Sequence, residues 1–347
     1  MSIPTLTDRE RDVLVAVIDS FVRTAAPVGS QKIGTDYEFG VSAATIRNTM
    51  ADLEAKGLLT HPHTSAGRLP TDLAYRYYVD GLMRRGRLTS RERVQIEQEF
   101  VGLEVAGVED LVSKAARVLT LLTGELGLAM GPMLALATLE RLELIQVSSE
   151  KVLLVLTLES GVVRTVYVDV TSSVPRATLE AVSAALNDRL AGATLRQVQA
   201  TLHERLESVN LPDPEAQGLM NIFLHSERDV FECALQERAV HLGSTTALAE
   251  QPEFTASDRM LELIHLTERR ELLVSVLGGR ADSDGLQITI GTEHTQPELE
   301  DLTIVTANYS IGSLRGTVGV IGPTRMPYQK VVSIVDWTSG LMTRLTP

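Results

Sequence analysis

The sequence contains a single cysteine, Cys233, among its 347 residues. One thiol can form neither an intrachain disulfide nor a cluster of thiolate metal ligands, and such sparse usage is typical of a reducing cytoplasm. The first residues, MSIPTLTDRERDVL, have no basic segment followed by an apolar run, so they do not resemble a secretory signal. No stretch reaches the roughly 18 uninterrupted apolar residues of a membrane helix. We therefore expect a cytoplasmic protein without a membrane partner.

The sequence also lacks the short motifs of common enzymes. There is no G-x-S-x-G, no P-loop, no H-E-x-x-H and no G-x-G-x-x-G that opens a helix. We expect no catalytic residue and no cofactor. Gly278-Gly279-Arg280 and Gly322-Pro323-Thr324-Arg325 could bind an anion, although ordinary turns explain them equally well. Cys233 lies in an apolar helical pattern and is expected to be a packing residue.

The charge is unevenly distributed along the chain. The net charge of −13 is unfavourable for binding nucleic acid, but residues 1–93 carry 13 basic and 11 acidic residues, whereas the remainder carries 19 and 34. Residues 61–93 alone hold seven arginines against three acids. The N-terminal segment is therefore the part that could meet DNA.

Three short helices are predicted in residues 1–57. Thr7 and Glu10 form a capping-box pattern, and apolar residues at helical spacing follow them. Ser30 is the expected N-cap of a second helix and Ser42 that of a third, which ends at Gly57. A short helix, a glycine-containing turn and another helix give the order of a helix-turn-helix.

The outward face of the third helix carries side chains suited to base edges. Short residues at its start would let it enter a major groove closely, and Arg47 and Asn48 suit guanine and adenine. We place Ala43, Thr45, Arg47, Asn48 and Thr49 on this face. A small helical bundle with a merely solvated polar face explains the same pattern.

The next segment predicts a β-hairpin. Residues 58–60 can pair with residues 67–69 across a loop rich in turn residues, and three helices followed by a hairpin is the order of a winged helix. A wing would bring hydroxyls, backbone amides and an arginine to the DNA backbone or minor groove. A purely structural hairpin remains an alternative, and a metal site at His61 and His63 lacks further ligands, so we expect no metal. The candidate DNA-binding residues are Ser42, Ala43, Thr45, Arg47, Asn48, His63, Thr64, Ser65, Gly67 and Arg68.

The remaining chain predicts an α+β protein. Thr71 caps a helix whose tyrosines we expect to be core, and Arg84, Arg85 and Arg87 after it could reach phosphates or form a solvated linker. Helices are expected from Ser90 to about Leu103 and from Val108 to about Thr123, followed by an antiparallel meander in residues 142–170. Residues 177–250 read as helices without strands. Strands are expected again at 271–278, 286–291, 302–309 and 316–322, before a closing helix over 327–345.

Two long segments carry a resemblance. Ser42 to Asp80, SAATIRNTMADLEAKGLLTHPHTSAGRLPTDLAYRYYVD, and Gly316 to Trp337, GTVGVIGPTRMPYQKVVSIVDW, resemble the heat-inducible transcription repressor (HrcA) family. The resemblance implies a homodimeric repressor of chaperone operons that binds the CIRCE inverted repeat and depends on the GroEL/GroES chaperonin. It also implies a winged helix followed by a GAF-like domain with an inserted dimerisation domain. Pro327 is a small departure from the family pattern.

Combining both lines of reasoning gives four segments. Residues 1–88 would form the winged helix-turn-helix, 89–175 a linker helix and the first part of the GAF-like domain, 176–252 the mainly helical dimerisation insert, and 253–347 the second GAF-like part. Leu219, Ile222 and Phe223 form an apolar stripe that could serve the dimer or the core of its own domain. The alternative function is a metabolite-sensing transcription regulator, controlled by a ligand in the GAF-like pocket. An enzyme with a fused winged helix is a third possibility, disfavoured by the missing motifs.

Overall fold

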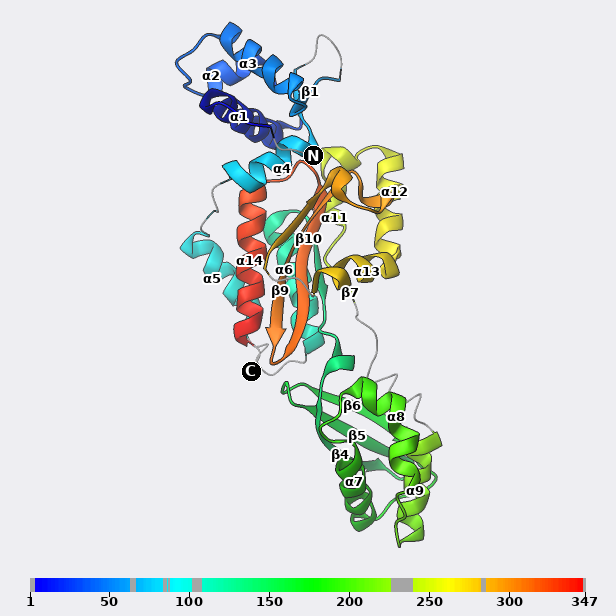
Figure 1. Ribbon diagram of the computed structural model, residues 1–347. Helices are drawn as coiled ribbons and strands as arrows, with labels where there is room; N and C mark the ends of the chain where they lie inside the picture. The colour runs from blue at the N-terminus through cyan, green and yellow to red at the C-terminus, as the bar shows by residue number, and fades with distance from the viewer. Residues whose placement is uncertain are drawn as a thin grey trace.

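The computed structural model describes residues 4–62, 67–83, 86, 88–101, 108–225, 240–281 and 285–345. Three units follow one another in an elongated arrangement: a helical unit at one end, a five-stranded sheet in the centre and a three-stranded sheet with its helices at the other end (Figure 1). Within these described residues, no helix is long and apolar enough to cross a membrane.

The N-terminal unit contains the three predicted helices: α1 (Asp8–Thr24), α2 (Ser30–Asp36) and α3 (Ala43–Ala55). The capping box is present, because Glu10 N donates to Thr7 Oγ1 at 3.3 Å and Thr7 N donates to Glu10 Oε2 at 2.8 Å. Apolar side chains from all three helices, such as Leu14, Ile33 and Ile46, are fully buried together.

The predicted hairpin is also present. β1 (Leu59–Thr60) pairs antiparallel with β2 (Leu69–Pro70). The chain before α2 adds an isolated antiparallel β-bridge, because Val28 and Arg68 exchange two backbone hydrogen bonds of 2.9 Å. Gly67 is required here, since a Cβ on it would lie 2.6 Å from the carbonyl carbon of Val28.

The central unit is built around one antiparallel sheet with the order β7-β3-β10-β9-β8. The strands are β3 (Leu126–Met130), β7 (Val240–Leu242), β8 (Gln287–Ile290), β9 (Leu302–Ile311) and β10 (Leu314–Pro323). Linking helices α4 (Asp72–Tyr77), the π-helix η1 (Tyr78–Leu82) and α5 (Ser90–Phe100) precede it.

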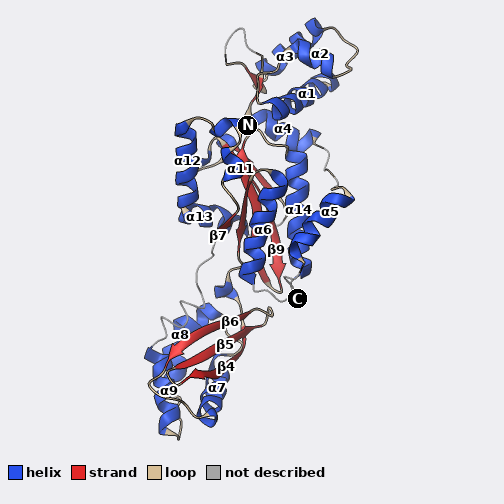
Figure 2. Cartoon of the chain, turned by 180° about the vertical axis from the view of Figure 1, so that it is seen from behind, coloured by secondary structure: helices blue, strands red, loops and turns tan. Residues whose placement is uncertain are grey.

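Helices cover both faces of this sheet (Figure 2). α6 (Val108–Thr123) and α14 (Tyr328–Leu345) pack on one face, and α11 (Thr246–Ala249), α12 (Ser257–Glu268) and α13 (Arg270–Ala281) share a core with the other. Along β3, Leu126 and Leu128 face α12 and α13, whereas Ala129 faces α6. At Gly127 a Cβ would collide with the carbonyl of Ala116, so glycine allows α6 to pack closely.

The third unit corrects the predicted division of the chain. The meander β4 (Leu139–Ser148), β5 (Lys151–Leu158) and β6 (Val163–Asp169) does form, but as a separate sheet with the order β4-β5-β6. It packs with α7 (Arg176–Leu190), α8 (Leu195–Glu207) and α9 (Pro214–His225). The inserted unit therefore contains the meander as well as the helices, and β7, expected to lie within a strandless insert, returns to the central sheet. Periodicity predicts strands but does not specify which sheet they join.

Residues 271–278, predicted as a strand, belong to α13. A short apolar run fits either structure, and here Leu273 and Leu277 are buried one helical turn apart. Gly278 to Arg280 therefore lies in a helix, and the buried Arg280 donates to Thr306 Oγ1 at 3.2 Å. Cys233 lies outside the described residues.

Candidate nucleic-acid interface

The exposed face of α3 is the first component of the site. The side chains of Arg47 and Asn48 are exposed and form no hydrogen bond or ion pair with any described residue. Ala44 and Ala51 are exposed at the positions one turn before and after them, so small side chains flank the two polar ones. These alanines were not among the residues predicted on the exposed face. Helical spacing could have found them, because Ala44, Arg47, Asn48 and Ala51 recur at i, i+3, i+4 and i+7 on the face opposite Ile46, Met50 and Leu53.

The start of α3 is fixed by its cap. Ser42 Oγ accepts a hydrogen bond from Thr45 N at 3.2 Å and lies 3.0 Å from Thr45 Oγ1. Ala43 is half-buried beside them. Thr49, predicted on the outward face, is buried instead and donates to the carbonyl of Thr45 at 3.1 Å. A threonine hydroxyl can bond the carbonyl one turn earlier, which lets this residue point inward.

Glu54 near the end of α3 connects the helix to the hairpin. Its Oε2 pairs with Arg68 Nε at 2.7 Å, and its Oε1 pairs with His61 Nδ1. Both side chains at the base of the hairpin are thus held by one carboxylate. Among the described residues there is no group of His, Cys, Asp or Glu that could hold a metal ion. His63, Thr64 and Ser65 lie outside the described residues.

A second ion pair fixes α3 to α1. Lys56 Nζ lies 2.6 Å from Glu10 Oε1, and Glu10 is buried. The hydrogen bond from Lys56 is the main cause that lowers the pKa of Glu10, followed by the hydrogen bond from Thr7 N. This pair orients α3 relative to the rest of the helical unit.

The helical unit is attached to the central unit through α4. Tyr75 is buried, as predicted, and its ring packs on Tyr328 with centroids 5.5 Å apart. Arg76 makes a bidentate pair with Glu293, with distances of 2.7 and 2.6 Å. Asp72 accepts hydrogen bonds from Thr292 N at 2.9 Å and Thr292 Oγ1 at 3.1 Å. The predicted basic run at Arg84, Arg85 and Arg87 lies outside the described residues.

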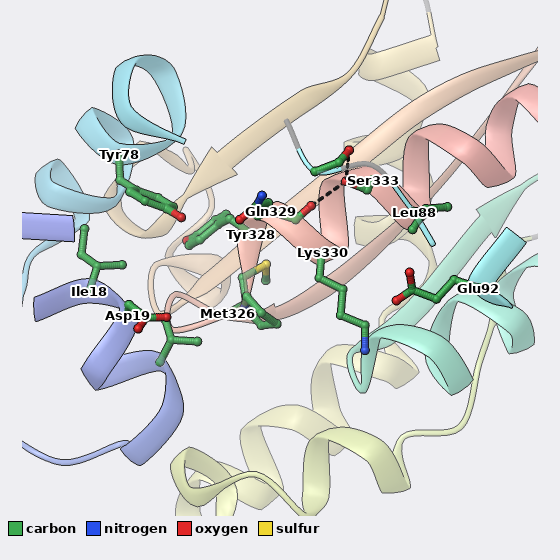
Figure 3. Close-up of a pocket in the computed structure, with 13 residues that line it drawn as sticks. Ile18, Asp19, Tyr78, Leu88, Glu92, Met326, Tyr328, Gln329, Lys330 and Ser333 are labelled. Carbon is green, nitrogen blue, oxygen red and sulfur yellow. Dashed lines mark hydrogen bonds between the residues drawn. The ribbon is translucent and has the colours of Figure 1, made fainter. Parts of the chain in front are cut away.

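A pocket of about 320 Å³ lies at the joint between these units. Figure 3 shows Ile18 and Asp19 from α1 on one side, and Met326, Tyr328 and Lys330 on the other. Asp19 is engaged by the hydroxyl of Tyr37. Burial and the bond to Asp19 raise the pKa of Tyr37 to about 12, so this hydroxyl stays protonated.

The fold and this interface define a modular α+β protein of regulatory type. It consists of a small helical unit, in which α3 exposes polar side chains that have no partner among the described residues, and of an antiparallel-sheet domain to which this unit is attached. The chain also matches the family model described as the HrcA protein C terminal domain over residues 109–332. The chain belongs to the heat-inducible transcription repressor (HrcA) family.

Relatives match this chain over nearly its whole length. The Heat-inducible transcription repressor HrcA of Chlorobium chlorochromatii is 35% identical over 97% of both chains. The protein of the same name from Halalkalibacterium halodurans is 34% identical over 98% of this chain and 97% of its own. A crystal structure of a hypothetical protein has the same fold, with a TM-score of 0.70, 22% identity and 98% of each chain covered.

Proposed function

We propose that this protein is a transcription repressor whose N-terminal unit is a winged helix and whose helix α3 reads DNA in the major groove. The observation that carries the proposal is the pair Arg47 and Asn48, whose side chains are exposed between Ala44 and Ala51 and form no hydrogen bond or ion pair with any described residue. The alanines allow the helix to approach closely, while the longer side chains reach the base edges. The names of the relatives, which are heat-inducible transcription repressors, support the same function.

The hairpin is the proposed wing. Gly67 brings its backbone against residues 27 and 28, and Glu54 engages the Nε of Arg68. Arg68 therefore positions the wing relative to α3, in addition to any phosphate contact. His63, Thr64 and Ser65 at the tip are proposed to contact the DNA backbone, and Ser42, Ala43 and Thr45 to form the start of the reading helix.

Two copies are required to read an inverted repeat symmetrically. In the stripe of Leu219, Ile222 and Phe223, Leu219 and Phe223 are buried within their own unit, which favours the core role for the stripe, so we place the contact elsewhere. The three-stranded sheet offers a better surface, since α7, α8 and α9 cover only one of its faces. Register places Ile145, Leu153 and Tyr167 in one row across the open face.

We propose that a second copy of this chain covers that face. The row is apolar, with Ile145 46% and Tyr167 63% exposed, which is costly for a monomer. Its surroundings carry both signs of charge: Arg141 pairs with Glu143 at 2.6 Å, and Lys151 lies opposite Asp169. A patch with an apolar centre and charges of both signs can pair with its own copy about a two-fold axis without an excess of like charge.

The proposed operator is the CIRCE inverted repeat, and the proposed partner that maintains activity is the GroEL/GroES chaperonin. The test is fluorescence anisotropy of the full chain on a CIRCE duplex and on a scrambled duplex of equal composition, at two salt concentrations, with and without chaperonin. We expect preference for the repeat by at least a hundredfold. Affinity should decrease strongly with salt, because contacts between the N-terminal face and phosphates release counterions.

Arg47→Ala should cost about 1–3 kcal/mol of operator binding and relax specificity at one base position. Arg189→Ala provides the matched control, because it removes an equally charged, exposed side chain from α7 in the remote unit. Equal loss in both variants would contradict the assignment of α3.

A further inference from the structure

A second cavity, of about 690 Å³, lies in the central unit between α12 and the beginning of β9. Its apolar walls are formed by Phe254, Leu263, Leu266 and Leu302, which belong to the core on this face of the sheet. The volume lies within the range of roughly 300–1,000 Å³ typical of small-molecule sites.

Ion pairs line this cavity. Arg259 Nη1 contacts both Asp301, at 2.5 Å, and Glu262, at 3.0 Å. Arg269 pairs with Glu298. Arg259 lies on α12 and Arg269 directly follows it, and two of their partners lie in residues 298–301, so these pairs join α12 to the segment before β9.

The charges around this cavity do not balance. Four carboxylates line it, from Glu253, Glu262, Glu298 and Asp301. Three guanidinium groups pair with them, because Arg325 engages Glu253 and the two arginines named above engage the others. Arg325 is not itself a lining residue, and the imidazole of His265, which also lines the cavity, is counted as neutral. On this count the four carboxylates exceed the three guanidinium groups by one negative charge. A ligand with an apolar body and one cationic group therefore complements the site best.

One wall of the cavity is connected to the helical unit. Glu253 lines the cavity and holds Arg325 through a bidentate pair, with distances of 2.5 and 2.9 Å. Arg325 Nη1 donates to the carbonyl of Val22 in α1 at 2.6 Å. Val22 lies six residues before Val28, which pairs with Arg68 at the base of the hairpin. The side chain of Arg325 is only 13% exposed, so this contact is sheltered from solvent.

We propose that this cavity is an effector site for a small apolar molecule bearing one ammonium group, and that Glu253 and Arg325 transmit its occupancy to the DNA-binding unit. The ammonium competes with Arg325 for Glu253. Arg325 then no longer donates its hydrogen bond to the carbonyl of Val22. As a result, α1 and the hairpin paired with the segment that follows it lose this contact with the central unit. The binding of this ligand therefore weakens DNA binding, and DNA weakens ligand binding by the same factor. The second part of this inference rests on the proposed function.

The binding part is tested with three probes of one shape: 2-phenylethylammonium, 2-phenylethanol and phenylacetate. Calorimetric titration of the full chain should show the ammonium binding at least fivefold more tightly than the alcohol and phenylacetate weakest. Glu253→Gln removes the carboxylate that the ammonium engages and should reduce ammonium affinity about fivefold, whereas Asp258→Asn, exposed on α12 outside the cavity lining, should not change it. Equal binding of the three probes, or none, would overturn the site.

The transmission part is tested on the inverted-repeat duplex. Saturating 2-phenylethylammonium should raise the DNA Kd at least threefold in the parent chain. Arg325→Lys keeps the charge but cannot hold Glu253 and Val22 together. Because the weaker competitor frees Glu253, this variant should bind the probe at least as tightly as the parent does, while the threefold effect on DNA disappears. An unchanged or lower Kd in the parent would overturn transmission. Failure of the probe-free parent to bind the duplex would instead refute the proposed function, and calorimetry would still decide the site.

Discussion

Glu125 should make the stability of the central unit strongly dependent on pH. Its side chain is 2% exposed, and burial raises its pKa to about 8, although a hydrogen bond from Gln251 Nε2 at 2.8 Å opposes the shift. A group whose native pKa exceeds its unfolded pKa binds its proton more tightly in the folded state. The stability that it contributes is present below about pH 4.5 and is lost as the pH rises toward 8.

The magnitude follows from linkage. Between pH 5 and pH 8 the difference in proton binding should destabilise the parent protein by about 3 kcal/mol through this residue alone. Glu125→Gln keeps the shape and an acceptor for Gln251 but has no charge to bury. The variant should therefore resemble the parent at pH 5 and be more stable by about 3 kcal/mol at pH 8.

Urea unfolding at both pH values would measure this difference. The single tryptophan, Trp337 in α14, reports on the central unit through its fluorescence. Glu204→Gln, an exposed position on α8, is the control and should change neither midpoint. An equal difference in unfolding free energy between Glu125→Gln and the parent at both pH values would refute the reasoning. It would mean that the buried carboxyl titrates alike in the folded and unfolded states.

Three further predictions concern the interface and the dimer. Gly67→Ala should destabilise the helical unit by about 1–3 kcal/mol, measured by thermal unfolding, because its Cβ would displace the backbone at Val28; an unchanged midpoint would contradict the close approach. Glu54→Gln should release Arg68 for a phosphate contact, which should raise affinity for scrambled DNA and steepen the slope of log affinity against log salt concentration by about one. An unaltered slope would argue against the restraint of Arg68 by Glu54. Tyr167→Glu should dissociate the dimer in sedimentation experiments, whereas Leu121→Glu, at a similarly exposed position on α6, should not; equal behaviour of the two would exclude the open sheet face.

Much of the helical unit could be predicted from the sequence. The capping box of Thr7 and Glu10 and the cap at Ser42 were expected and are present. The hairpin was expected between residues 58–60 and 67–69, and it forms with residues 59–60 paired with 69–70. Each depends on side chains and amides within a few residues of one another, so local sequence suffices. The family was also identified from two continuous segments, and the matches over nearly the whole chain confirm it.

The connections between distant segments could not be predicted in this way. Val240–Leu242 joins the central sheet by pairing with β3, and residues 271–278 form a helix although their composition suits a strand. The double engagement of Glu54, and the bond from Arg325 to Val22, link side chains to groups whose positions depend on the whole fold. Periodicity along a long segment indicates its conformation and buried face, but a short apolar run such as residues 271–278 fits a helix or a strand, and the choice of partner depends on the free energy of packing all segments together. The sequence alone thus determined the three N-terminal helices, the hairpin and the family. The tertiary structure decided the conformation of residues 271–278, which sheet each strand joins and which charges meet.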